Sequence, residues 1–133
     1  MKKQTLLLVD PDDGARDALA ELLRDAGYSV LEARDGSVGF RMALEWLPGL
    51  VIVEPWPSFP ASVRVVERLR SAAATRHVPV LALTTAAAPE HRTRALAAGC
   101  ADYLEKPCPP ERVLRVVRRI LGPAPSGAAA DRA

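Results

Sequence analysis

Four polar residues have side chains and positions that would suit a site for a charged group. Each lies directly after a segment expected to be a strand: Asp10, Glu54, Thr84 and Lys106. The carboxyl ends of parallel strands meet at one edge of a sheet, and the usual binding crevice of such sheets lies there. If the strands are parallel, two carboxylates, one hydroxyl and one ammonium therefore converge on a single small site.

Lys106 stands out because the chain otherwise uses arginine for nearly all of its cations. Its only other lysines are Lys2 and Lys3. A compact ammonium fits as a point charge between oxygens, where a planar guanidinium does not. This favours a specific role for Lys106 at the predicted site, while a purely structural ion pair is the alternative.

The segments that precede these residues have the composition of buried strands. Continuous apolar runs are typical of strands covered on both faces, as in a parallel sheet. Three segments are such runs, namely 5–9, 50–53 and 78–83, and two weaker ones are 28–33 and 101–105.

Helical periodicity fills the intervals between these segments. The expected helices are 13–26, 36–47, 61–73, a shorter one from Pro89 to Gly99, and 110–121. Asp12 or Asp13 would cap the first helix, and Gly27 would end it. Strands that alternate with helices of this length imply right-handed crossovers. The sequence therefore predicts an α/β fold with a doubly wound parallel sheet of five strands.

Composition sets limits on the class of protein. The chain has 133 residues, 49% hydrophobic and 26% charged, with a formal net charge of +2. These values suit one domain with a real core, and the charge excess is too small to indicate direct nucleic-acid binding. The apolar runs are too short for a membrane span, and no signal peptide is recognisable. We therefore expect a cytoplasmic location without membrane contact.

The last residues differ in composition from the rest of the chain. The stretch "PAPSGAAADRA" has no apolar periodicity. It predicts a domain over residues 1–122 and a flexible tail or truncated linker over 123–133. Cys100 and Cys108 lack metal-site spacing, so we expect two reduced thiols.

Six fragments in order resemble the receiver domains of two-component response regulators. They are "LLLVDPDD", "GYSVLEARDG", "PGLVIVE", "ATRHVPVLALTT", "ALAAGCADYLEKP" and "PPERVLRVVRRIL". Each fragment alone is weak evidence, but together they cover about residues 5–121 at the family's spacing. The resemblance implies a flavodoxin-like fold with strand order 2-1-3-4-5.

The resemblance also implies roles for single residues. In receivers, an acidic pair after strand one holds Mg²⁺, and an Asp that ends strand three accepts a phosphoryl group. Asp10 matches the first acid, Thr84 the hydroxyl that contacts that group, and Lys106 with Pro107 a Lys-Pro pair joined by a cis peptide bond. Tyr103 matches the aromatic residue that changes rotamer on activation.

The sequence departs from this family pattern at three places. Pro11 stands where the second acid would be, and Glu54 stands at the phosphoacceptor position. Pro55 and Pro57 remove two backbone N–H groups from the following loop. Phosphoryl transfer depends on positioning and charge neutralisation, so each departure weakens it. We interpret the chain as an atypical pseudo-receiver that works independently of phosphorylation.

The cofactor expectation follows from the same residues. Losing a direct ligand is serious for Mg²⁺, which needs near-octahedral oxygen ligation. Lys106 could bridge Asp10 and Glu54 directly, so no metal is expected, although Mg²⁺ would be the cofactor if the pocket still binds one. Asp10, Asp12 and Glu54 are the weak candidate ligands, and Asp12 is better placed to cap a helix.

The remaining expectations concern partners. By resemblance, the fourth helix, fifth strand and fifth helix would contact a kinase, an output domain or another signalling protein, and a homodimer is left open. Trp56 and Phe59 either pack a rigid turn or add to a contact patch. Glu54 either imitates a phosphorylated Asp or is inert.

Two alternatives to this function are a phosphorylation-competent, Mg²⁺-dependent receiver and a flavodoxin-like small-molecule binder. The second would need a phosphate-cradling loop, yet "DPDDGA" is acidic and not Gly-rich. An enzyme is not expected, since no activated nucleophile is recognisable.

Overall fold

The computed structural model describes residues 4–54, 59–84 and 89–122, with side chains for all of these except 59–63, 84 and 89. Within these ranges, strands and helices alternate along the chain. The strands are β1 (Thr5–Val9), β2 (Ser29–Ala33), β3 (Leu50–Val53), β4 (Val80–Thr84) and β5 (Asp102–Glu105). The helices are α1 (Asp13–Asp25), α2 (Gly36–Trp46), α3 (Phe59–Ser71), α4 (Pro89–Ala98) and α5 (Pro110–Leu121).

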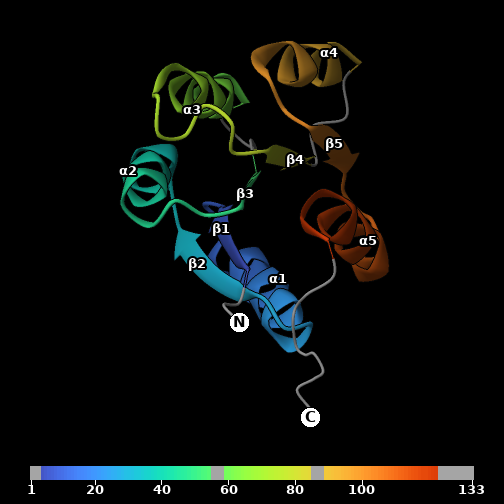
Figure 1. Cartoon of the computed structure of the whole chain (residues 1–133). Helices are drawn as coiled ribbons and strands as arrows, with labels where there is room; N and C mark the ends of the chain where they lie inside the picture. Colours follow the sequence, from blue (N-terminus) through green and yellow to red (C-terminus); the bar gives the residue numbers. More distant parts are fainter. Residues whose placement is uncertain (1–3, 55–58, 85–88, 123–133) are drawn as a thin grey trace.

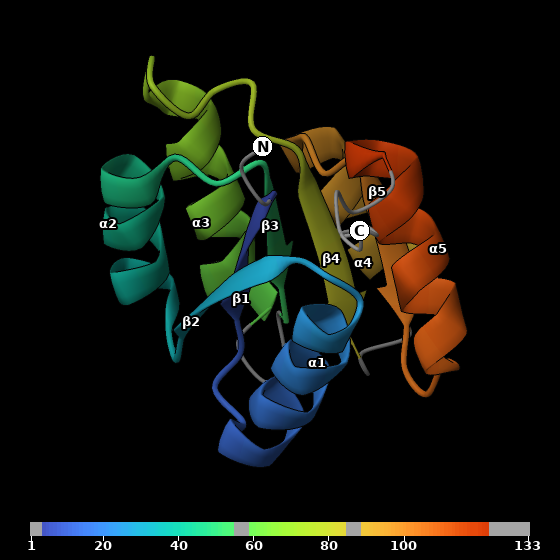
Figure 2. The same cartoon turned by 60° about the horizontal axis from the view of Figure 1, so that its bottom comes forward.

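The strands form one parallel sheet in the order β2-β1-β3-β4-β5. Figures 1 and 2 show α1 and α5 on one face of the sheet and α2, α3 and α4 on the other. The strand order reverses direction between β1 and β3, which places the switch point of the fold at their carboxyl ends. The predicted flavodoxin-like fold and its strand order are confirmed.

Alternate residues of the strands supply two separate cores. Leu6 and Leu8 of β1 pack with residues of α1 and α5, whereas Leu7 and Val9 pack with residues of α2, α3 and α4. Successive side chains of a strand point to opposite faces, so a strand covered on both sides must be apolar throughout. This is the physical reason for the continuous apolar runs in the sequence.

Two local features hold α1 and α2 in place next to the site. The carboxylate of Asp12 accepts a hydrogen bond from the Ala15 N–H at 3.2 Å and caps α1, which settles the choice between Asp12 and Asp13. On α2, a Cβ on Gly39 would lie 2.8 Å from Cγ2 of Val9. Glycine therefore allows α2 to pack closely on the last residue of β1, directly before Asp10.

Some predicted element bounds were wrong by about two residues. β4 begins at Val80 instead of 78, because the Val78 N–H donates to the Thr75 carbonyl in a turn and is lost to the strand ladder. α3 runs over Phe59–Ser71 instead of 61–73. The other strands and helices start and end within one residue of their predicted positions.

Three smaller expectations can be compared with the structure. Cys100 is buried and Cys108 is half-buried, and both are free thiols, as predicted. Within the described ranges, no helix is long and apolar enough to cross a bilayer. The predicted tail at 123–133 and the residue Trp56 lie outside the described residues.

Candidate functional site

The parallel ladder brings Asp10 and Glu54 to the same edge of the sheet. Val9 is in register with Val53, and the Glu54 N–H continues the ladder by donating to the Val9 carbonyl at 2.8 Å. The Asp10 N–H likewise donates to the Ala33 carbonyl at 3.0 Å. Asp10 is only 3% exposed and Glu54 only 8%. The two acids are therefore held side by side by backbone hydrogen bonds and are largely removed from water.

Lys106 supplies the positive charge for these carboxylates. Its Nζ lies 3.3 Å from Oε1 of Glu54 and 3.8 Å from Oδ2 of Asp10. The Lys106–Pro107 peptide bond is cis, as the resemblance implied. The Lys106 side chain is 26% exposed, so the ammonium lies at the boundary between the pocket and solvent. The structure thus brings together three of the four predicted site residues.

The loop that carries Asp10 is fixed by further hydrogen bonds. Oδ1 of Asp10 accepts from the Asp12 N–H at 2.9 Å, and the Asp10 carbonyl accepts from Nη1 of Arg16 at 2.7 Å. Arg16 also contacts Glu32 of β2, with 3.3 Å between Nε and Oε1. Sequence reasoning missed Arg16. The available signal was an arginine in the first turns of α1 together with an acid at the end of β2.

Burial raises the pKa of the Asp10 carboxyl above its usual range. The hydrogen bond from the Asp12 N–H and the charge of Lys106 oppose this effect but are smaller than it. The raised pKa means that folding is penalised when Asp10 is ionised. This penalty is absent below the unfolded value of 3.8, where Asp10 is protonated in both states, and it develops as the pH rises through the folded pKa.

Replacing Asp10 with asparagine is accordingly expected to stabilise the protein near neutral pH by on the order of 1 kcal/mol. The amide oxygen keeps the hydrogen bond from Asp12, and Lys106 keeps its closer partner, Glu54. Urea unfolding at several pH values measures the effect. The gain should shrink as the pH falls toward the unfolded value of 3.8, because protonation of the wild-type carboxyl removes the penalty. If Asp10→Asn instead lowers the free energy of unfolding at neutral pH, the attraction between Asp10 and Lys106 outweighs the cost of desolvating the Asp10 carboxylate.

Tyr103 lies inside the protein. It is 2% exposed and packs in the same core as Ala82, Ala95 and Cys100. Arg92 of α4 donates from Nη1 to the Tyr103 carbonyl at 3.4 Å, and its guanidinium lies 6.0 Å from the ring centroid. The phenol thus occupies an inward position between β5 and α4.

The other predicted site residues cannot be placed in the same detail. The backbone of Thr84 pairs with Glu105 at the end of β4, so it reaches the expected edge of the sheet, but its side chain lies outside the described residues. Phe59 begins α3, and its side chain lies outside them as well.

The geometry of a switch-point pocket with a buried acid pair and a lysine agrees with a match to a family model. The model for the response regulator receiver domain matches residues 6–118. The chain belongs to this family. It is a receiver module of two-component signalling, and such domains are typically non-enzymatic modules that interact with kinases and output domains.

Relatives and solved structures agree with this assignment. The DNA-binding regulator RpaA of Synechocystis is 32% identical over 116 residues, which cover 87% of this chain and 48% of RpaA. The phosphate regulator PhoB of Pseudomonas aeruginosa is 28% identical, with 96% and 57% covered. The chain therefore spans about half the length of these relatives.

The structural neighbours are closer in length. The chemotaxis protein CheY4 of Vibrio cholerae has a TM-score of 0.84 at 28% identity, covering 90% of this chain and all of CheY4. The receiver domain of the histidine kinase PA1611 from P. aeruginosa has a TM-score of 0.82 at 27% identity, covering 91% and 99%. That structure holds a magnesium ion in its active-site cleft.

The residues of this receiver do not fit the Mg²⁺ ion that the family implies. Pro11 offers no side-chain ligand, Asp12 caps α1, and the carboxylates of Asp10 and Glu54 face the Lys106 ammonium. In the part of the chain that the structure describes, no three His, Cys, Asp or Glu side chains gather to hold a metal. Mg²⁺ needs oxygen ligands in near-octahedral geometry, and two carboxylates paired with an ammonium are a small donor set for it.

Proposed function

We propose that this chain is an atypical receiver that signals through protein contacts without a cycle of phosphorylation. The observation that carries this proposal is the position of Lys106, whose ammonium lies within 3.3 Å of Glu54 and 3.8 Å of Asp10. The two acids and the lysine sum to about −1, so direct ion pairing replaces most of the need for a divalent cation. The pocket is then a structural element and not a site of phosphoryl transfer.

The identity of the acceptor supports the same conclusion. A glutamate is one methylene longer than an aspartate, which moves its carboxylate by on the order of 1 Å, enough to cost about 100-fold in rate. Glu54 is also buried and close to the Lys106 ammonium. A phosphoryl donor would have to displace this ion pair and would find no second acid at Pro11.

The contact surface in this proposal is formed by α4, β5 and α5. It carries an exposed Leu96 on α4, an exposed Glu105 on β5, and the ion pair between Arg119 of α5 and Asp102 of β5. The partner is a kinase, an output domain or another signalling protein. The receiver spans residues 1–122, and residues 123–133 serve as a tail or linker. With no phosphoryl trigger, Tyr103 keeps its inward position.

Titration with MgCl₂ tests the metal-free pocket. The backbone amides of Asp10, Asp12 and Glu54 are expected to show no saturable shift in NMR spectra through the millimolar range, because Lys106 already pairs with both carboxylates. An NaCl titration at equal ionic strength separates screening from binding. Saturation in the millimolar range or below at these three amides would contradict the proposal and favour a Mg²⁺-dependent, phosphorylation-competent receiver.

A further inference from the structure

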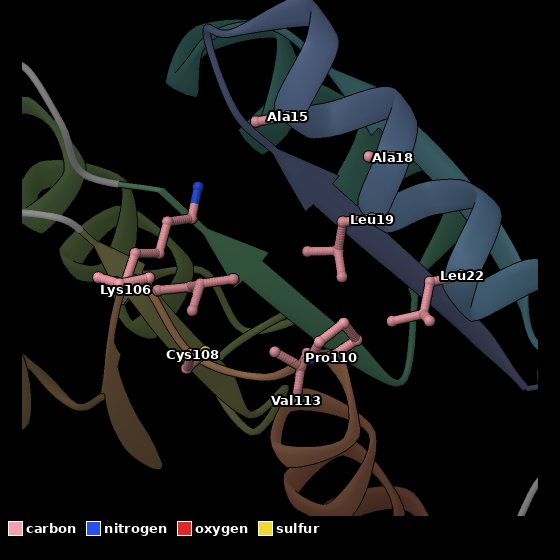
Figure 3. A pocket seen from close by; sticks show the side chains of 10 residues that line it. Ala15, Ala18, Leu19, Leu22, Lys106, Cys108, Pro110 and Val113 are labelled. Atoms are coloured by element: carbon pink, nitrogen blue, oxygen red, sulfur yellow. The ribbon is translucent and has the colours of Figure 1, made fainter.

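An apolar groove and an apolar patch lie apart from the acid pair. The groove has a volume of about 480 Å³ and runs between α1 and the segment that leads into α5, where Figure 3 shows Leu19 and Leu22 on one side and Val113 on the other. Its lining is apolar except for Lys106 at one end. The patch lies at the end of α2, and there the backbone and the neighbouring charges indicate what would cover it.

This α2 patch consists of Leu44, Trp46 and Leu47. The three residues are 40%, 57% and 56% exposed. Single exposed apolar side chains are common on protein surfaces and need no explanation. Three large ones within four consecutive residues form a contiguous apolar surface, which is typical of a site that contacts another molecule.

The backbone of Leu47 indicates that its side chain serves a contact outside the protein's own fold. Its φ is 49°, in the left-handed region, and its N–H donates to the Ala43 carbonyl at 2.9 Å to close α2. Glycine is the usual residue at such a helix end, because a Cβ is disfavoured there. Leu47 nevertheless remains more than half exposed. The leucine thus strains the backbone and gains little burial, which a contact between molecules would explain.

Two charged residues beside the patch make this surface complementary to itself. Along α2, Arg41 lies almost one turn before Leu44 and Glu45 directly after it, and both charged side chains are exposed. Among the described residues, neither takes part in an ion pair. A partner with charges of one sign would attract one of them and repel the other. A second copy satisfies both, since a two-fold axis near Leu44 brings Arg41 of each copy to Glu45 of the other.

We propose that the α2 patch joins two copies of this chain in a symmetric dimer. The two α2 helices lie antiparallel, with Leu44 against its own counterpart, and Trp46 and Leu47 extend the contact beyond the helix end. A standard stable interface buries about 800 Å² on each partner, which is more than one helix and its cap supply. The dimer is therefore weak, with a dissociation constant between about 10 µM and 1 mM.

Such a dimer leaves the proposed signalling surface free. Figure 1 shows α2 beside β2 at one edge of the sheet, whereas α4, β5 and α5 lie at the other edge. The dimer would present two copies of that surface, so a partner with two binding sites would bind it more tightly than it binds the monomer. The contact uses no residue of the acid pocket. Failure of this proposal would therefore leave the proposed function as it stands.

Sedimentation equilibrium of the full chain tests the proposal, at low salt so that the charges are not screened. The wild type should convert reversibly from monomer to dimer between about 10 µM and 1 mM. Arg41→Glu and Glu45→Arg should each weaken the dimer at least about fivefold, since each places like charges opposite one another twice. Arg115→Glu is the matched control, because it makes the same change of charge at an exposed position of α5, and it should change the constant less than about twofold.

Combining the two charge changes distinguishes a second copy from any other partner. The double variant Arg41→Glu/Glu45→Arg restores opposite charges across the two-fold axis and should regain the wild-type dissociation constant to within about twofold. An equimolar mixture of the two single variants should associate more tightly than either variant alone, because the glutamate of one then faces the arginine of the other.

Leu47→Gly tests the role of the strained residue. The dimer should weaken at least about fivefold, because the apolar side chain is lost. The urea midpoint of unfolding, measured at about 1 µM where the dimer is dissociated, should stay unchanged or rise, because glycine adopts this backbone without strain.

Four results would overturn the proposal. They are a monomer at every concentration up to about 1 mM, equal weakening by Arg41→Glu and Arg115→Glu, no recovery in the double variant or the mixture, and a lower urea midpoint in Leu47→Gly. The second would place the contact elsewhere on the surface, and the last would make Leu47 part of the monomer's own fold.

Discussion

Replacing Lys106 with methionine is expected to lower the free energy of unfolding by about 2–3 kcal/mol near neutral pH. The substitution leaves the carboxylates of Asp10 and Glu54 close together, nearly buried and without their cation. Removing one partner from a buried ion pair is costly because the remaining charge stays desolvated. The 26% exposure of the lysine keeps the expected loss below that of a fully buried pair.

Urea unfolding at different pH values measures this loss and its cause. Lys106 lowers the pKa of Asp10, so its removal raises that pKa further. The penalty should therefore shrink as the pH falls and the Asp10 carboxyl takes up a proton. Arg119→Met is the matched control, since it breaks a more exposed pair with Asp102 and should cost less than about 1 kcal/mol. An equal cost for both variants would argue against a special role of Lys106.

The second large effect is a gain of function from two substitutions. Pro11→Asp combined with Glu54→Asp is expected to create Mg²⁺ binding that saturates in the millimolar range or below. It should also raise the rate of labelling by a small phosphodonor by about 100-fold or more. The first change restores an oxygen ligand beside Asp10, and the second shortens the acceptor by one methylene. NMR titration and mass spectrometry measure the two properties.

The single variants are the controls for this experiment. Glu54→Asp alone still lacks an acid at position 11, and Pro11→Asp alone still has the longer acceptor, so each should gain less than the pair. If the double variant neither binds Mg²⁺ nor reacts with the phosphodonor, residues 11 and 54 are not what prevents Mg²⁺ binding and phosphorylation in the wild type. The larger obstacle would then be the loop with Pro55 and Pro57.

The fold could be predicted from the sequence because its signals are local and repeated. Apolar runs over 5–9 and 50–53 became β1 and β3 without change. The predicted start of β4 at residue 78 was wrong, because Val78 donates its backbone hydrogen bond to Thr75 in a turn and is not part of the strand. Apolar character alone does not distinguish a ladder residue from a buried turn residue, so such ends depend on tertiary hydrogen bonds.

The site was predictable only in part, for a related reason. Strand ends indicated that Asp10, Glu54 and Lys106 would meet, and the structure brings them together. The role of Arg16 depends on a backbone carbonyl, that of Asp10, which no side-chain pattern reveals. The groove along α1 depends on small side chains on two elements far apart in sequence. Such features arise from packing and require coordinates.

One measurement tests the central claim most directly, namely that this receiver acts without phosphorylation. The wild-type chain is incubated with a small phosphodonor and MgCl₂, and its intact mass is recorded beside that of a phosphorylation-competent receiver treated in the same way. We predict that the mass stays unchanged while the competent receiver gains a phosphoryl group. An added mass of about 80 Da that maps to Glu54 or a neighbouring acid would contradict the account.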